Sequence, residues 1–111
     1  MEFTRGDTYK FKFQRLDSDN QPIMTKTEKM WFTVKTNYYT EDIKLQKTLD
    51  NGIEFTEDGY YHITIEHDDT KDLSYGAYVC DIQVENAGVV QTIYKGNLTL
   101  TNEVTFDGGV A

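Results

Sequence analysis

Apolar and polar residues alternate along most of this chain with a period of two, which is typical of β-strands that are half exposed to water. In TYKFKFQRL, residues 8–16, three aromatic residues alternate with lysine and glutamine. The same pattern recurs in KMWFTVKT, residues 29–36, and in GAYVCDIQVE, residues 76–85. The inward positions predicted from this alternation are Tyr9, Phe11, Phe13, Met30, Phe32, Val34, Tyr61, Ile63, Ile65, Tyr78, Cys80, Ile82 and Val84.

Turn-forming residues separate these segments. DSDNQP, residues 17–22, joins side chains that bond their own backbone to a proline that blocks strand pairing. The Asn-Gly pair in DNG, residues 50–52, predicts a tight hairpin because it tolerates positive φ angles. Gly96 interrupts the last strand and predicts a bulge or bend there.

The count of short strands, without the spacing of βαβ units, predicts an all-β fold. We expect an antiparallel, immunoglobulin-like β-sandwich of about seven to eight strands, in preference to a small barrel. Residues 1–105 are predicted to form this domain. Residues 106–111, FDGGVA, are predicted to form a flexible C-terminal tail.

Composition limits the classes of binding partner that we expect for this chain. The formal net charge of the 111 residues is −8, so nucleic acid and anionic membranes are not expected partners, because both are bound by clustered Lys and Arg. No run approaches the roughly 18 to 20 apolar residues that cross a bilayer. The chain is therefore expected to be made in a cytoplasm and to remain outside the membrane. Cys80 is the single cysteine, which excludes an internal disulfide.

Several residues invite a chemical interpretation. Cys80 falls mid-strand on the apolar face, where a thiol is core filler, whereas a catalytic thiol needs an electropositive, partly exposed setting. His67, Asp68 and Asp69 are consecutive and match no standard zinc spacing. They predict a turn capped by an aspartate, with Thr70 beginning a helical turn through KDLSY. A small metal-dependent hydrolase would instead need these three side chains to converge.

DSDNQ resembles the opening of a calcium loop, but Pro22 replaces the glycine required at the sixth position. A solvated loop is expected there. His62 alternates outward on its strand, and no phosphate loop or nucleophile elbow is present. The sequence therefore predicts a protein that is not an enzyme, with no catalytic residues, no metal and no cofactor.

The segment GAYVC has the Gly-x-Tyr-x-Cys order of the corner found in immunoglobulin-like sandwiches, in which the tyrosine hydroxyl bonds to upstream backbone. We expect Tyr78 to make this bond. Trp31 falls on the face opposite Met30, Phe32 and Val34, and there is no cysteine on an earlier strand. The likeness to a true immunoglobulin domain is therefore one of architecture.

A longer series of short motifs runs through the chain, and its order resembles the N-terminal β-sandwich domain of baseplate upper proteins of tailed phages. The series begins with GDT and FTVK, continues with DT and GAYVCDI, and ends with TIYKG and VT. The residues that carry it are Gly6, Asp7, Thr8, Phe32, Val34, Lys35, Asp69, Thr70, Gly76, Tyr78, Asp81, Ile82, Thr92, Ile93, Gly96, Val104 and Thr105. The chain stops after EVTFDGGVA, where such proteins continue.

This resemblance implies a structural module of a phage or prophage tail, located in the virion and free of catalysis. The partners it implies are other tail or baseplate proteins, and further copies of the same chain are a second expectation. Trp31, Tyr38 and Tyr39 are the predicted interface residues, because exposed aromatic side chains are enriched at interface hot spots. The alternative is a small carbohydrate-binding module that stacks sugar rings on the same three residues.

Overall fold

The computed structural model describes residues 1–103, which form eight strands and one short helix. The predicted domain boundary at residue 105 and the predicted tail, residues 106–111, lie outside the described residues, as do Val104 and Thr105. The elements are β1 (Glu2–Thr4), β2 (Tyr9–Gln14), β3 (Lys29–Lys35), β4 (Ile43–Leu49), β5 (Gly52–Phe55), β6 (Tyr60–Ile65), α1 (His67–Thr70), β7 (Gly76–Asn86) and β8 (Val89–Thr101).

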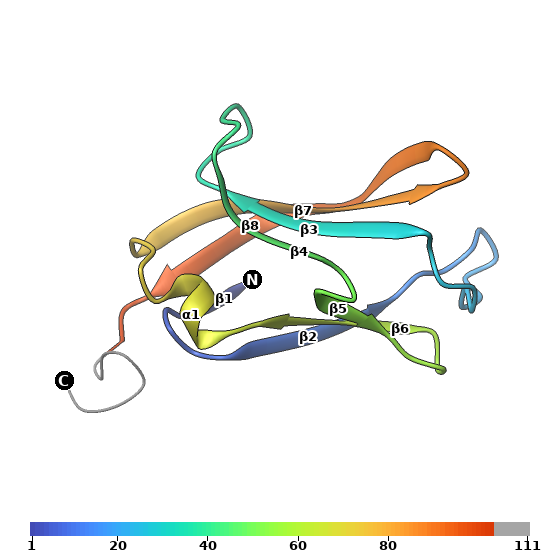
Figure 1. Cartoon of the computed structure of the whole chain (residues 1–111), viewed down its shortest axis with the longest axis horizontal. Coiled ribbons are helices and arrows are strands. Elements are labelled where there is room, and N and C mark those ends of the chain that lie inside the picture. Colours follow the sequence, from blue (N-terminus) through green and yellow to red (C-terminus); the bar gives the residue numbers. More distant parts are fainter. Residues whose placement is uncertain (104–111) are drawn as a thin grey trace.

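All eight strands belong to one sheet, in the order β1-β8-β7-β3-β4-β5-β6-β2. The sheet curls on itself, so that β8, β7, β3 and β4 form one layer and β5, β6 and β2 the other (Figure 1). The curl brings the two ends of the sheet near each other in a nearly barrel-shaped molecule. The prediction of an all-β fold is confirmed.

The prediction of purely antiparallel pairing is wrong at two places. β1 pairs with β8 in parallel, and β4 pairs with β5 in parallel. The second pair replaces the hairpin expected at the Asn-Gly turn. The positive φ angles fall on Asp50 (66°) and Gly52 (100°), and the chain passes there from one layer to the other instead of reversing within a layer (Figure 1).

The core lies between the two layers and follows the predicted alternation. Phe32, Tyr61, Ile63 and Ile65 are completely buried. Aromatic rings join the layers: Phe11 of β2 meets Phe32 of β3 edge to face, with 5.5 Å between ring centroids. Burial of the apolar face of each strand is what selects the strand registers, since a slip by one residue would turn every inward side chain outward.

The irregularity in β8 lies at Ile93, so the bulge predicted at Gly96 is misplaced. Ile82 pairs with Tyr94 and Gln83 pairs with Thr92, which leaves Ile93 as the extra residue. Gly96 stays in register opposite Cys80. A Cβ at Gly96 would overlap the Tyr94 ring, so the glycine leaves room for that ring to lie over the strand.

The corner before β7 carries the predicted tyrosine bond. The Tyr78 hydroxyl donates to the Ser74 carbonyl oxygen at 2.7 Å, and the ring is buried. The helical turn lies earlier than predicted, because α1 ends at Thr70 instead of beginning there. The aspartate cap is present: Asp69 accepts a hydrogen bond from the Glu66 N–H at 2.7 Å. Within residues 1–103, no helix is long and apolar enough to cross a membrane.

Replacing Tyr78 by phenylalanine is expected to lower the free energy of unfolding by about 1 kcal/mol, because the Ser74 carbonyl loses its donor while the ring keeps its packing. Urea denaturation would show this as a lower midpoint with an unchanged slope. Tyr39→Phe is the control, since that side chain is 96% exposed. Equal midpoints for both variants would contradict a structural role for the corner bond.

Candidate functional site

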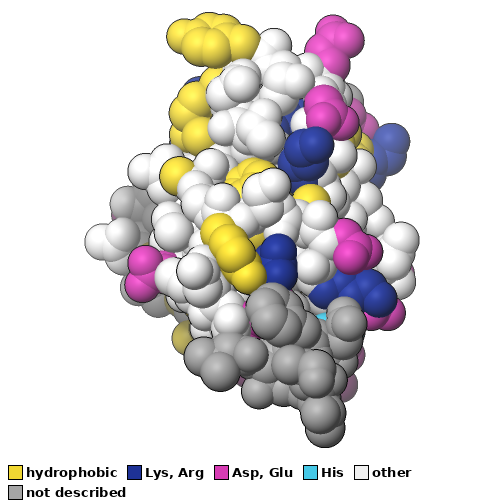
Figure 2. All heavy atoms as spheres, turned by 90° about the vertical axis from the view of Figure 1, so that its left-hand side faces the viewer, with side chains coloured by type: hydrophobic (Ala, Val, Ile, Leu, Met, Phe, Trp, Pro, Cys, Tyr) yellow, Lys and Arg dark blue, Asp and Glu magenta, His cyan; other side chains and the backbone are white. Residues whose placement is uncertain are grey.

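The loop between β3 and β4 displays two of the three predicted interface residues. Tyr38 is 54% exposed and Tyr39 is 96% exposed. The loop projects from the molecule in Figure 1, and hydrophobic side chains stand out at the same end in Figure 2. Tyrosine side chains pack well in protein cores and interfaces. Two adjacent tyrosines exposed on one loop are therefore candidates for contact with a partner.

Side-chain hydrogen bonds fix this loop. The Asn37 carbonyl oxygen Oδ1 accepts from the N–H of Tyr39 at 2.9 Å and from the N–H of Thr40 at 3.0 Å. The Thr40 hydroxyl then accepts from the Asp42 N–H at 3.1 Å. Asparagine and threonine side chains that bond the following backbone define tight turns. The two tyrosines are therefore presented from an ordered turn, which reduces the entropy lost on binding.

Trp31, the third predicted residue, lies elsewhere on the same layer. It is half buried on the outer face of β3, between Thr48 of β4 and Gln83 of β7. Tyr38 and Lys35 border a small hollow on that face. Lys35 follows Trp31 by four residues on β3, which is about 13 Å along the strand at the usual rise per residue. The structure thus places Trp31 and Tyr38 on one face, whereas Tyr39 extends from the loop.

Charged groups surround Tyr38. The Lys95 ammonium lies 5.8 Å from the centre of the Tyr38 ring, a cation–π distance. Burial raises the pKa of the nearby Asp81 carboxyl, while Lys35 and Lys95 act in the opposite direction. This face therefore combines aromatic surface with both signs of charge, a mixture that suits polar partners such as proteins or sugars.

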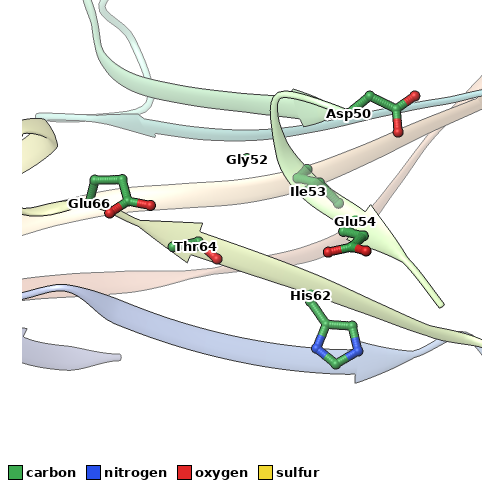
Figure 3. Close-up of a pocket in the computed structure, with 7 residues that line it drawn as sticks. All are labelled: Asp50, Gly52, Ile53, Glu54, His62, Thr64 and Glu66. Atoms are coloured by element: carbon green, nitrogen blue, oxygen red, sulfur yellow. The ribbon is translucent and has the colours of Figure 1, made fainter.

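A second hollow, of about 440 Å³, lies on the outer face of β5 and β6. Figure 3 shows its polar side chains: Glu54 and His62 lie toward one end, Glu66 lies at the other, and Asp50 points away. Asp50 pairs with Lys26 at 3.6 Å, and the His62 Nε2 atom lies 3.1 Å from the Thr56 hydroxyl. In Figure 3 the carboxylates of Asp50, Glu54 and Glu66 do not point toward one another.

The HDDT segment is also spread over separate partners. The His67 Nδ1 atom contacts the Gly6 carbonyl oxygen, and Asp68 is exposed beside Lys71. Asp69 pairs with Lys47 at 2.7 Å in addition to capping α1. Among residues 1–103, no group of three or more His, Cys, Asp or Glu side chains is placed to hold a metal ion. His67 Nε2 lies 3.9 Å from Asp68, but Asp69 is turned to Lys47, so the three side chains do not converge on one point.

Two further candidates have structural roles. The Asp17 carboxylate accepts from the N–H groups of Asp19 and Gln21 at 2.8 and 3.0 Å, so the DSDNQ segment is an aspartate-stabilised turn. Cys80 is 2% exposed, and burial raises the pKa of its thiol. A raised pKa disfavours the thiolate, which is the reactive form. The prediction that Cys80 fills the core is confirmed.

One apolar surface was missed from the sequence. A groove of about 360 Å³ opens between β2, one end strand of the sheet, and the part of β8 that the other end strand, β1, does not cover. Its lining consists of Met1, Phe11, Phe13, Ile82, Ile93 and Tyr94. The alternation assigned Phe11 and Phe13 to a closed core, yet both are only half buried. The available signal was the absence of charge in VVQTIY, residues 89–94.

Comparison with known proteins bears on the fold of this chain. No protein-family model and no curated protein sequence matches this chain. An endo-β-1,4-mannanase from Thermotoga petrophila is similar in structure, with a TM-score of 0.57 and 16% sequence identity. The match covers 92% of this chain and 17% of the mannanase chain. At this identity the likeness concerns the fold alone.

Proposed function

We propose that this chain is a non-enzymatic structural module of a phage or prophage tail or baseplate, and that it acts through protein–protein assembly in the virion. The order of motifs from Gly6 to Thr105 in the sequence supports the phage assignment. The observation that carries the assembly role is the ordered β3–β4 loop, which holds Tyr38 and Tyr39 in solvent. Rigid exposed aromatic residues are the usual anchors of a binding surface.

The chemistry of the remaining polar groups supports a non-enzymatic role. His67, Asp69 and Asp17 are each engaged in hydrogen bonds or ion pairs that hold a turn or join two elements. A general acid or base needs a neighbouring group at which its proton is used, and a nucleophile needs an activating partner. Structural partners account for these side chains without such a reaction.

We further interpret the curled sheet as an immunoglobulin-like sandwich whose layers remain joined through β4 and β5. The Tyr78 bond to Ser74 supports this interpretation, because a tyrosine corner marks the entry into a late strand of such sandwiches. The parallel β1–β8 pair at the N-terminus is compatible with it, since an edge strand can join either layer.

The experiment that tests the assembly role is sedimentation of a tagged chain from phage-producing bacteria. The proposal predicts that the protein sediments with tail particles in a density gradient. Replacing Tyr38 and Tyr39 together by serine is expected to reduce the particle-bound fraction at least tenfold, a loss of about 1.4 kcal/mol or more of binding free energy. The cause is loss of the aromatic anchors, while the fold keeps its core.

Leu16→Ser is the control, because Leu16 is 51% exposed and follows β2, outside the β3–β4 loop. Equal particle-bound fractions for the control and the double variant would contradict the assigned surface. Recovery of the wild-type chain only in the soluble fraction would contradict the tail assignment itself.

The alternative function, carbohydrate binding, has one observation in its favour. Trp31 and Tyr38 lie on one outer face with the polar side chains of Thr33, Lys35 and Gln83 beside them. Such spacing allows two sugar rings to stack with hydrogen bonds between them. Titration with mannohexaose and cellohexaose tests it: saturable binding that is lost in Trp31→Ala would favour a carbohydrate-binding module over the assembly role.

A further inference from the structure

The turn between β4 and β5 exposes an asparagine that is followed by glycine. Asn51 is exposed, and the next residue, Gly52, begins β5. The Asn51 N–H donates to the Thr48 carbonyl oxygen at 2.9 Å, and the Thr48 N–H donates to the Asn51 carbonyl oxygen at 3.1 Å. These two bonds hold the backbone of Asn51 in the turn, while its side chain lies at the surface.

An asparagine side chain can react with the peptide nitrogen of the residue that follows it. Base removes the proton from that nitrogen, which then attacks the side-chain carbonyl carbon Cγ. The new C–N bond closes a five-membered succinimide ring, the bond from Cγ to the side-chain nitrogen breaks, and ammonia leaves with a proton taken from water. Water then opens the ring at either of its carbonyl groups, which gives aspartate or isoaspartate. This deamidation is one reason why asparagine is a thermolabile residue.

Glycine is the residue after asparagine that favours ring closure most. It has no Cβ to crowd the attacking nitrogen, and its backbone rotates more freely than that of any other residue. The chain has five further asparagines, and none of them precedes glycine: Asn20, Asn37, Asn86, Asn97 and Asn102. The chemistry therefore singles out Asn51 among the six.

The fold requires glycine at position 52. The φ angle of Gly52 is 100°, a conformation that residues with a side chain rarely adopt. A Cβ at Gly52 would also overlap the Lys47 side chain. The Lys47 ammonium pairs with the Asp69 carboxylate of α1 at 2.7 Å, so the lysine side chain is held against the turn. The crossing between the two layers thus retains the glycine that makes Asn51 reactive.

We propose that Asn51 is a site of spontaneous modification, at which the folded chain loses ammonia and converts the asparagine to aspartate and isoaspartate. Water and hydroxide are the reagents. Either product adds one negative charge beside Asp50 to a chain whose net charge is already −8. Isoaspartate also adds one carbon atom to the main chain between Asn51 and Gly52, which disturbs the pairing of Gly52 with Thr48 of β4.

Peptide mapping of the purified chain by mass spectrometry is the test. Trypsin cleaves after Lys47 and Lys71, and the peptide of residues 48–71 contains Asn51 as its single asparagine and contains no glutamine. After incubation of the folded chain in mildly alkaline buffer, this peptide is expected to gain about one dalton. Its rate is expected to exceed that of the peptide of residues 36–44, which contains Asn37, at least tenfold. The rate should rise with pH, because hydroxide removes the proton from the attacking nitrogen.

Asn51→Ser is the control variant, because serine is small and polar but cannot close the ring. It is preferred to Gly52→Ala, which strains the turn. The peptide of residues 48–71 is expected to keep its mass in Asn51→Ser. Urea denaturation gives a second readout: the midpoint of the wild-type chain should fall on incubation as isoaspartate accumulates, whereas that of Asn51→Ser should stay constant.

Three results would overturn the proposal. The first is a rate at Asn51 no higher than the rate at Asn37. The second is a gain of mass that occurs only when the chain is unfolded in urea, since the folded turn would then protect Asn51. The third is an equal gain of mass in the peptide of residues 48–71 of Asn51→Ser. All three are measured on the purified chain, so none of them bears on the tail assignment.

Discussion

Replacing Phe32 by alanine is expected to lower the free energy of unfolding by about 3–5 kcal/mol, because the ring is completely buried between the two layers. The substitution removes the edge-to-face contact with Phe11 and leaves a cavity that the surrounding strands fill only in part. The total free energy of unfolding of a domain of this size is about 5–15 kcal/mol. Urea denaturation followed by circular dichroism measures the change.

Phe32→Leu is the control for this substitution, since it retains most of the apolar volume and should lose much less stability. The comparison tests whether one core joins both layers. A loss below about 1 kcal/mol for Phe32→Ala would mean that the layers do not pack on each other at Phe32, and would contradict the curled sheet.

Replacing Thr70 by valine is expected to cost about 1–3 kcal/mol of unfolding free energy. The Thr70 hydroxyl, 1% exposed, accepts a hydrogen bond from the Gly6 N–H at 2.9 Å. Valine keeps the shape but leaves this buried donor without its acceptor. The bond attaches the turn after β1 to α1, so its loss should also loosen the N-terminal strand.

Thr70→Ser keeps the hydroxyl and serves as the control, with a smaller loss expected. Amide exchange gives the local readout: Thr99, whose N–H bonds to Met1, should exchange faster in Thr70→Val than in Thr70→Ser. Equal stability and equal exchange in both variants would show that Thr70 does not hold the N-terminal turn.

The inward face of the sheet could be predicted because buried positions follow a local pattern of apolar residues in the sequence. Met30, Phe32 and Val34 alternate with polar residues, and the period of two follows directly from strand geometry. The Tyr78 corner bond was also predictable, since both partners lie within five residues. These features depend on residues close together in the chain, and a pattern of neighbours is enough to find them.

The strand pairing could not be predicted in the same way. Parallel pairing of β1 with β8 joins residues nearly a hundred positions apart, and no local pattern reports it. The Asn-Gly turn misled the prediction because the residues that take positive φ are Asp50 and Gly52, at a change of layer. Gly96 misled it because a strand glycine serves either a bulge or a close side chain, and here it accommodates Tyr94.

The candidate surfaces differ in how far each could be predicted from the sequence. Tyr38 and Tyr39 follow an asparagine in a segment without strand periodicity, which is a local signal of an exposed turn. The groove between β2 and β8 depends on how far the sheet curls, a property of the whole fold. A nearly closed sheet exposes Phe11 and Phe13, whereas a closed one would bury them.

The most direct test of the tail assignment is immunogold labelling of phage particles from a producing strain, viewed by electron microscopy. The proposed function predicts gold at the distal end of the tail on intact particles, where a baseplate component would lie. Particles that carry no label, while the same antibody detects the chain free in the lysate, would contradict it.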